Sequence, residues 1–425
     1  MPGVDASGVR RAIVAAALGN AMEWFDFGVY GFLVVIIGRE FLPFENETTS
    51  LMASYLVFAA AFLGRPLGGM FFGPLGDRIG RKRVLVMTIV LMSVATFIIG
   101  VLPGYATIGI WAAVLLIVLR LIQGFATGGE YGGAATLIVE YAPDKWRGFV
   151  SSWLEFGTLL GFACGAGAVT LLTFFLTSET MTAWGWRIPF LCALPLGLIG
   201  LYIRLKIQES PSFQNMEDAE EAPKSSLREI FINHWRPLLQ CIGIVILLNV
   251  ADYTFLTYMP SYLNTELGLG EQVGRLILIG IMVCMMIVIT PLGALSDIVG
   301  RKPILIAASV GFLVLSWPAF FLMTHFGPAS TGVGLAIIGV LLVMLLSTLP
   351  STLPAIFKTH VRYGGFAVSY NISTMFFGGT APTVIVALVA STDNDYMPGF
   401  YLMLVAAVAL VPILLLRETA RKPLK

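Results

Sequence analysis

Long apolar stretches alternate with short polar segments along the whole chain. An apolar run of about 20 residues is long enough to cross a bilayer as a helix. Backbone polar groups in lipid must bond within their own segment, and the short alternating segments of membrane strands are missing from the sequence. The pattern therefore predicts an all-α membrane protein with twelve transmembrane helices, near residues 12–38, 51–75, 84–102, 109–141, 148–176, 187–208, 237–263, 273–296, 303–325, 332–357, 364–390 and 399–416.

A charged loop recurs at half the chain length. Residues 73–83 and 293–302 share a frame of Gly, three residues, Asp, two residues, Gly, Arg and Lys, and matching positions are 220 residues apart. Two homologous membrane halves explain such a repeat, which is typical of secondary transporters with a site between their halves. We therefore predict a six-helix bundle over 1–208, a cytoplasmic linker over 209–236 and a second six-helix bundle over 237–425.

The composition excludes several other classes of protein. Hydrophobic residues make up 57% of the chain and charged residues only 12%, where soluble domains carry about 25% charged residues. No Gly-x4-Gly-Lys-Ser/Thr pattern occurs, and the four cysteines lie inside predicted spans without the spacing of metal ligands. No nucleophile–histidine pair is readable and the net charge is only +1, so we predict no enzyme, no cofactor, no metal and no nucleic-acid partner.

The distribution of basic residues predicts the orientation in the membrane. If both termini are cytoplasmic, only Arg39, Arg187 and Arg275 fall on the opposite side. Arg65 and Arg120 lie within spans, and the other 21 of the 26 lysines and arginines fall in the termini or in cytoplasmic loops. This bias is what the positive-inside rule requires. The first span contains acidic residues, unlike the apolar core of a signal peptide, so we expect no cleaved leader.

The repeated loop predicts a cytoplasmic gate. Asp77 ends the second span near the start of the third, where an ion pair or a helix-terminus contact would hold the cytoplasmic side closed in one state. The basic loop residues alone are equally explained as topology anchors, whereas the fixed Asp and Gly positions indicate a specific geometry. The predicted gate residues are Asp77, Arg81, Glu140, Arg147, Asp297 and Arg301.

Acidic residues inside spans are the candidates for proton coupling. Glu23 and Asp26 are three residues apart and share one helix face. A charge at the centre of a membrane helix costs roughly 2.5–3.5 kcal/mol, so such residues are candidates for a functional role. Two close carboxylates repel, and we expect one to hold its proton near neutral pH. The alternative is a structural pair satisfied by Arg65 or Arg120. With Glu130 of the fourth span, these two acids are the predicted proton-coupling residues.

Several stretches carry a family resemblance. The repeated frame resembles the signature loop of the major facilitator superfamily. Other stretches are similar to its metabolite:proton symporter branch, namely Gly-Asn-Ala-Met-Glu-Trp-Phe-Asp-Phe at 19–27, Arg-Pro-Leu-Gly-Gly at 65–69, Gln-Gly-Phe at 123–125, Gly-Gly-Glu-Tyr at 128–131, Trp-Arg-Ile-Pro-Phe at 186–190 and Glu-Ser-Pro at 209–211. Within the branch the chain looks most like symporters of zwitterionic osmolytes, a likeness that extends to 256–263 and 351–355.

This resemblance runs over nearly the whole chain and implies the major facilitator fold. It also implies proton-coupled import of proline or glycine betaine by alternating access, in the bacterial inner membrane, with a monomer as the working unit. A symporter of di- or tricarboxylates such as α-ketoglutarate or citrate is the alternative within the branch, and a non-transporting membrane sensor is a third hypothesis. The residues after the twelfth span are too few for the coiled coil of some osmosensory relatives, so we expect no regulation through such a tail.

A zwitterionic substrate needs a cation for its carboxylate and aromatic faces for its ammonium group. Arg120 is the predicted cation, and Tyr131 returns to its face of the fourth span at 100° per residue. Asp252 is the repeat mate of Glu23, 229 residues further on. For each aromatic ring the alternative is ordinary packing in the membrane. The predicted substrate-binding residues are Arg120, Gln123, Trp24, Tyr131, Trp153, Asp252 and Tyr253.

Overall fold

The structure of the chain, a computed structural model, is built from helices. It describes residues 6–44, 46–79, 81–205, 231–358 and 361–424. These residues contain no strand and form twelve helical spans that are long and apolar enough to cross a membrane. The predicted all-α architecture is confirmed. The predicted linker lies almost entirely outside the described residues.

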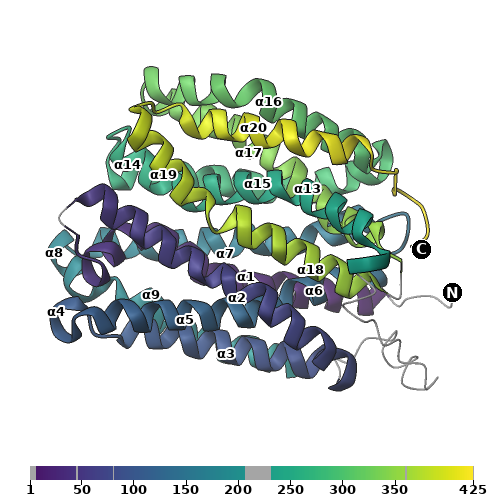
Figure 1. The fold of residues 1–425 in the computed structure, drawn as a ribbon, viewed down its shortest axis with the longest axis horizontal. Helices are drawn as coiled ribbons and strands as arrows, with labels where there is room; N and C mark the ends of the chain where they lie inside the picture. Colours follow the sequence, from purple (N-terminus) through teal and green to yellow (C-terminus); the bar gives the residue numbers. More distant parts are fainter. Residues whose placement is uncertain (1–5, 45, 80, 206–230, 359–360, 425) are drawn as a thin grey trace.

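The N-terminal half contains the first six spans, which lie in the lower part of Figure 1. Its elements are α1 (Ala6–Phe41), α2 (Glu47–Ile79), α3 (Arg81–Val101), α4 (Tyr105–Ile108), α5 (Ile110–Gly128), α6 (Glu130–Tyr141), α7 (Arg147–Phe175), α8 (Ser178–Thr180), the π-helical turn η1 (Met181–Gly185), α9 (Arg187–Leu191) and α10 (Ala193–Leu205). The fourth span is broken between α5 and α6 at Gly129, inside the glycine-rich stretch of the sequence.

The C-terminal half repeats the six-span arrangement above it in Figure 1. Its elements are α13 (Trp235–Tyr253), the π-helical turn η2 (Thr254–Tyr258), α14 (Met259–Thr265), α15 (Glu271–Val299), α16 (Arg301–His325), α17 (Pro328–Thr352), the 3-10 turn η3 (Pro354–Ile356), α18 (Arg362–Ser373), the π-helical turn η5 (Thr374–Gly378), α19 (Ala381–Thr392) and α20 (Met397–Leu414).

The sixth span begins earlier than the sequence predicted. The Thr177 side chain accepts a hydrogen bond from the N–H of Thr180 and so caps α8, and the chain stays helical through η1 into α9. The polar residues of this first turn read as a loop in a hydropathy pattern, because the sequence does not reveal that Thr177 caps a helix. The predicted start at residue 187 was therefore too late.

Glycines allow two helix pairs of the N-terminal half to approach closely. A Cβ atom at Gly157, Gly161 or Gly165 of α7 would lie 2.2, 2.4 or 2.8 Å from a backbone oxygen of α1. At Gly124 and Gly128 of α5 it would lie within 2 Å of a backbone oxygen of α2. Real Cβ atoms do not come so near, so only glycine permits this packing. It brings α1, α2, α5 and α7 together around the charged residues described below.

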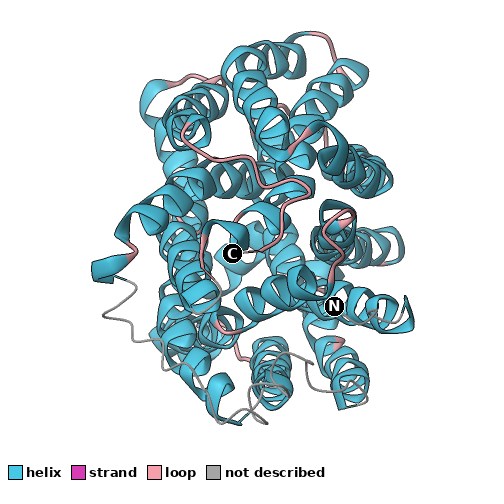
Figure 2. Ribbon diagram, turned by 90° about the vertical axis from the view of Figure 1, so that its right-hand side faces the viewer, coloured by secondary structure: helices cyan, strands magenta, loops and turns pink. Residues whose placement is uncertain are grey.

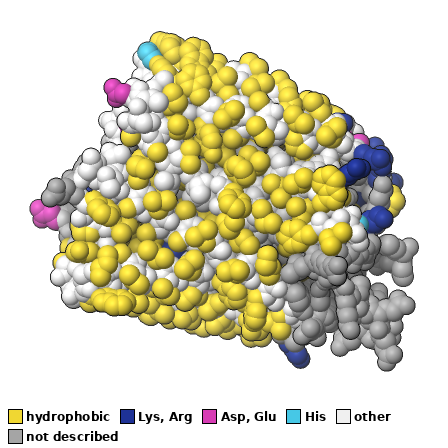
Figure 3. Space-filling view, in the orientation of Figure 1, with side chains coloured by type: hydrophobic (Ala, Val, Ile, Leu, Met, Phe, Trp, Pro, Cys, Tyr) yellow, Lys and Arg dark blue, Asp and Glu magenta, His cyan; other side chains and the backbone are white. Residues whose placement is uncertain are grey.

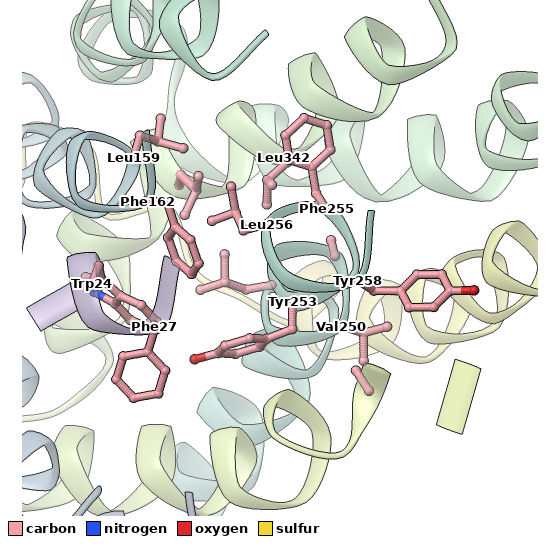
Figure 4. Packing of buried hydrophobic residues seen from close by; sticks show 14 of the residues in the cluster. Trp24, Phe27, Leu159, Phe162, Val250, Tyr253, Phe255, Leu256, Tyr258 and Leu342 are labelled. Carbon is pink, nitrogen blue, oxygen red and sulfur yellow. The ribbon is translucent and has the colours of Figure 1, made fainter. Parts of the chain in front are cut away.

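The two halves share one hydrophobic contact surface. Contacts between them join α7 to α15 and α17, and α2 to α18. Figure 4 shows the buried side chains at the centre of this surface, which come from α1, α7, α13, η2 and α17. Among them, the rings of Trp24 and Tyr253 extend toward each other from opposite halves, with centroids 6.1 Å apart.

The helix α1 begins and α20 ends at the same end of the bundle, which we call the terminal end (Figure 1). Figure 2 views the bundle from this side, with the helices nearly end-on. Lysine and arginine side chains gather here, and hydrophobic side chains cover the flank between the two ends (Figure 3). This distribution fits a bundle that crosses a bilayer. That the terminal end is the cytoplasmic one stays a prediction.

Candidate functional site

Three buried carboxylates of the N-terminal half each face a different arginine. Glu23 and Asp26 lie on α1 and are 3% and 2% exposed, and Glu130 opens α6 with 6% exposure. These are the three predicted proton-coupling residues, and each has its own arginine as ion-pair partner. Each of the three carboxylates thus has an arginine nitrogen within 4 Å.

The first pair joins Asp26 to Arg120 of α5. The Arg120 Nη1 lies 3.3 Å from Asp26 Oδ2 and donates a 2.8 Å hydrogen bond to Gln123 Oε1. The Gln123 amide in turn donates to Asp26 Oδ2 and to the Thr96 hydroxyl, both at 2.8 Å. The guanidinium also lies 3.8 Å from the ring centre of Tyr30. All these partners belong to the N-terminal half, so Arg120 and Gln123 form part of an internal cluster.

The second pair joins Glu23 to Arg65 of α2 more loosely. The Arg65 Nη2 lies 3.8 Å from Glu23 Oε1, too far for a hydrogen bond. The Arg65 Nε instead donates to Asn371 Oδ1 of α18 at 3.4 Å, and so crosses to the C-terminal half. Within the described chain, both oxygens of Glu23 and both terminal nitrogens of Arg65 are buried without a hydrogen-bond partner. Such groups are costly in a protein interior unless a partner is supplied.

The third pair joins Glu130 to Arg204, near the end of α10. The Arg204 Nη2 makes a short ion pair with Glu130 Oε1, and its Nη1 donates to the carbonyl of Leu85. The Thr88 hydroxyl donates to the other Glu130 oxygen at 3.3 Å. Glu130 is therefore fully partnered within one half, unlike Glu23.

Beside these pairs, a chain of hydrogen bonds leads from α1 to the C-terminal half. The Trp24 indole donates to Asn20, and the Asn20 amide donates to the Thr158 hydroxyl at 2.7 Å. The Thr158 and Tyr131 hydroxyls both donate to the Glu155 carboxylate. The ring of Tyr131 stacks on Tyr370 of α18, with centroids 4.3 Å apart. Tyr131 thus links a buried carboxylate to the opposite half.

The other predicted substrate-binding residues fall in different places. Tyr253 lies among the aromatic rings of both halves, with its centroid 5.0 Å from that of Phe62. Asp252 is buried on the same helix, and its Oδ1 has no hydrogen-bond partner among the described residues. Trp153 packs against Phe156 of its own helix, with ring centroids 5.0 Å apart. In the described part of the chain, its ring contacts do not include the aromatic rings around Tyr253.

Four predicted gate residues lie at the terminal end, where the halves meet. The Asp297 carboxylate of α15 accepts hydrogen bonds from the N–H groups of Gly148 and Phe149 at the start of α7. Arg301 lies 3.4 Å from Asp297, and Glu140 lies 3.7 Å from Arg362 of the other half. Arg147 donates to the carbonyl of Lys422. The side chains of Asp77 and Arg81 lie outside the described part of the structure.

The opposite end is closed as well. The Tyr55 hydroxyl of α2 lies in hydrogen-bond contact with the Ser261 hydroxyl of α14 and donates to the carbonyl of Thr257 at 3.3 Å. Arg275 of α15 donates to the Thr173 hydroxyl of α7 at 3.3 Å. With contacts between the halves at both ends, the polar groups at the centre are enclosed, as in the occluded stage of alternating access.

The sequence did not single out some residues of this site. The sequence identified Arg65 only as an alternative partner of Glu23 and Asp26, and it did not single out Arg204 or Glu155. Asn371 and Tyr370 carried no signal beyond their polarity within a span. The position of Arg65 inside a predicted span, as the first residue of the Arg-Pro-Leu-Gly-Gly stretch, was the signal that could have identified it as a site residue.

Comparison with known proteins places the chain in a family. The family described as sugar (and other) transporter matches residues 12–235 and 222–425. The proline/betaine transporter of Salmonella typhimurium is 47% identical to this chain, over 99% of this chain and 86% of that protein. The chain belongs to the sugar (and other) transporter family. The glycine betaine/proline/ectoine/pipecolic acid transporter OusA of Dickeya dadantii has the same identity and coverage, and the ectoine/proline transporter ProP of Corynebacterium glutamicum is 40% identical over 98% of this chain and 85% of that protein.

Solved structures of a proton symporter described as a member of the major facilitator superfamily share the fold of this chain. The proton:xylose symporter XylE, bound to 6-bromo-6-deoxy-D-glucose, matches with a TM-score of 0.82 and 17% identity, over 99% of this chain and 98% of that one. A partially occluded inward-open form of XylE from E. coli matches with a TM-score of 0.75 and 18% identity, over 97% and 99%. The chain is therefore a multi-pass transporter of small molecules in the bacterial cell membrane, and not an enzyme.

Proposed function

We propose that this chain is a proton-coupled symporter that imports small zwitterionic osmolytes, of the proline and glycine betaine class, by alternating access. The observation that carries the proposal is the set of three buried carboxylate–arginine pairs next to aromatic rings of both halves. Each intramembrane charge costs roughly 2.5–3.5 kcal/mol, so a transporter retains such groups for the ions or substrates that they bind. The printed names of the relatives at 40–47% identity support the substrate class.

The charges at the centre fit a zwitterion better than a polyanion. The described centre holds Arg65 at the contact between the halves and Arg120 in an internal pair, together with the acids Glu23 and Asp26. Citrate, with three carboxylates, would need more cations than acids here. Transport of di- or tricarboxylates therefore finds no support, either in these charges or in the names of the relatives. The transported partners are the zwitterion and protons carried by Glu23, Asp26 or Glu130.

The terminal end serves as the cytoplasmic gate in this proposal. The contacts of Asp297 with α7, and of Glu140 with Arg362, hold it closed and must break when the site opens inward. The clustering of basic residues at this end supports its placement on the cytoplasmic side. The two bundles, 1–208 and 237–425, move against each other as units joined by the linker, and one chain suffices for transport.

Uptake into proteoliposomes tests the function. Purified protein is supplied with labelled proline, glycine betaine, α-ketoglutarate or citrate, with and without an imposed proton gradient. We expect accumulation of proline and glycine betaine that collapses when the gradient is dissipated. A preference for either organic acid would overturn the substrate class. Accumulation that follows a sodium gradient instead would overturn the coupling ion.

A further inference from the structure

Arg65 differs from the other two paired arginines of the site in where it bonds. In the described chain, Arg120 and Arg204 donate hydrogen bonds only to groups of the N-terminal half. Arg65 donates from its Nε to Asn371 of α18, and Asn371 donates in turn to the carbonyl of Gly128. Its guanidinium therefore lies at the surface where the halves separate during transport.

The guanidinium of Arg65 also has free capacity for a ligand. It is fully buried, and its Nη1 and Nη2 have no hydrogen-bond partner in the part of the chain that the structure describes. These two nitrogens form the planar fork that binds a carboxylate through two parallel hydrogen bonds. Arg120 also has two nitrogens, Nε and Nη2, without a hydrogen-bond partner among the described residues. Its Nη1, however, already donates to Asp26 and Gln123, and its guanidinium lies against aromatic rings of its own half rather than at the contact between the halves.

Aromatic rings lie next to the guanidinium of Arg65. Its guanidinium carbon is 5.7 Å from the ring centre of Trp24 and 5.5 Å from that of Phe62. Tyr253, from the other half, lies 5.0 Å from Phe62 and 6.1 Å from Trp24 between centroids. Ring faces attract a quaternary ammonium group within about 6 Å of their centres. A group that can bind a carboxylate and rings that can bind an ammonium group thus lie next to each other.

We infer that Arg65 binds the carboxylate of the substrate and that Glu23 is the counter-ion which the substrate replaces; this inference rests on the proposed function. Before substrate binds, the Glu23 carboxylate neutralises Arg65, whose Nη2 lies 3.8 Å from Glu23 Oε1. When Glu23 takes a proton from the side to which the site is open, it becomes neutral and releases Arg65. The substrate carboxylate then takes its place, and one proton enters with each zwitterion. Release reverses both steps, so the pair is neutral before and after transport.

Other charged groups surround Glu23 and tune this exchange. Those that act on its carboxylate are Glu130 of α6, Arg65 of α2, Arg204 of α10 and Glu155 of α7. Tyr253 of α13 faces it from the C-terminal half. Glu130 is held by Arg204 and Glu155 by two hydroxyl donors. Glu23 lacks such hydrogen bonds among the described residues, which makes it the carboxylate of this group that is poised to exchange its proton.

Calorimetric binding to the purified full chain tests the inference, with glycine betaine and with choline, which keeps the trimethylammonium group but lacks the carboxylate. We expect Arg65→Gln to weaken glycine betaine binding about 100-fold or more and to abolish the preference over choline. Arg65→Lys should retain part of the affinity. The matched control is Arg187→Gln, which removes an arginine that pairs with Glu40 at the opposite end, and it should bind within about threefold of the parent, since rim pairs contribute little.

A second variant keeps the test decisive if Arg65→Gln fails to fold. Glu23→Gln mimics the protonated carboxyl, so it should bind glycine betaine more tightly than the parent at pH 8. Titrations in buffers of different ionisation enthalpy should show one proton taken up per substrate in the parent and none in Glu23→Gln. If Arg65→Gln folds and binds glycine betaine with unchanged affinity, Arg65 does not bind the substrate carboxylate. If proton uptake persists in Glu23→Gln, Glu23 is not the residue that takes up the proton. A parent protein that binds no zwitterion overturns the proposed function instead.

Discussion

The carboxylate of Asp297 reaches across the two halves to Gly148 and accepts a 2.8 Å hydrogen bond from its backbone N–H. Its second oxygen accepts from the next N–H of the same helix at 3.0 Å. The first N–H groups of a helix have no partner inside it, and the helix N-terminus favours a negative charge. A side chain of one half therefore caps the helix α7 of the other half. The repeated Asp of the charged loop thus has a physical role at the contact between the halves.

Removal of this charge should loosen the terminal end. In Asp297→Asn the amide accepts one of the two hydrogen bonds and turns an NH2 group toward the other N–H. Hydrogen bonds to a charged group are worth about 1.5–3 kcal/mol, so we expect the open state at this end to rise about tenfold or more. The measurement is the alkylation rate of Ser152→Cys, a buried position beside Gly293, in a variant without the native cysteines.

The matched control for this gate is Asp144→Asn. Asp144 also lies at the terminal end, but it is half exposed and its ion pair with Arg147 stays within one half. Exposed ion pairs contribute about 0–1 kcal/mol, so the alkylation rate should change by less than about fivefold. Equal rates in the Asp297 variant and in the control would show that the helix cap does not hold the gate.

Variants of the three paired carboxylates should differ in transport assays. Glu23→Gln should keep exchange of labelled glycine betaine across the membrane but lose accumulation driven by a proton gradient, because a neutral amide cannot carry the proton. Asp26→Asn and Glu130→Gln should lower the transport rate and still show accumulation that follows the gradient, since their arginines bond within one half. Loss of the gradient dependence in Asp26→Asn, with Glu23→Gln unaffected, would move the coupling site to the Asp26 pair.

The glycines of α7 offer a stability test with an internal control. In Gly161→Ala the new methyl group would lie 2.4 Å from a backbone oxygen of α1, so the two helices must move apart. Overpacking of this kind costs about 1–3 kcal/mol. Gly167 lies on the same helix with nothing within 4 Å of a Cβ atom, so Gly167→Ala should be neutral or slightly stabilising. Thermal unfolding midpoints in detergent compare the two, and equal shifts would refute close packing as the cause.

Glu418 should make the attachment of the C-terminal segment sensitive to acid. Burial alone would raise the pKa of this carboxyl, but hydrogen bonds from backbone N–H groups outweigh burial and hold the pKa below its usual range. The donors are Arg301, Lys302, Thr419 and Ala420. A carboxyl with a lowered folded pKa stabilises the attached state above its unfolded value of about 4.3, and this contribution is lost as the pH falls through the folded pKa.

We therefore expect the segment after α20 to gain mobility below about pH 4. A spin label at Lys422→Cys, in a variant without the native cysteines, reports this mobility from pH 7 to pH 3. Glu418→Gln should be mobile already at neutral pH and should respond little to acid. An identical pH response with and without Glu418 would show that another group holds the segment.

The sequence by itself determined the elements of this protein. Twelve apolar runs and a repeated Asp and Gly frame were sufficient to predict the fold, and charges inside apolar spans were sufficient to single out Glu23, Asp26 and Glu130 as candidates. This was possible because a membrane allows few structures: each long apolar run must be a helix, and each charge within it stands out. The start of the sixth span was missed because a capped polar turn reads as a loop.

Only the tertiary structure decided which charges meet. The sequence offered Arg65 and Arg120 alike as partners for the acids of the first span and named Arg120 as the substrate-binding cation. In the structure Arg65 bonds across to Asn371, whereas Arg120 is held within its own half by Asp26 and Gln123. In the same way, the partner of Asp297 proved to be the start of α7, 149 residues away. Such pairings depend on the rotation and spacing of packed helices, which glycines at α1–α7 and α2–α5 contacts set by close approach. A hydrophobic pattern records which face of a helix is buried, but not which side chain from another helix lies against it.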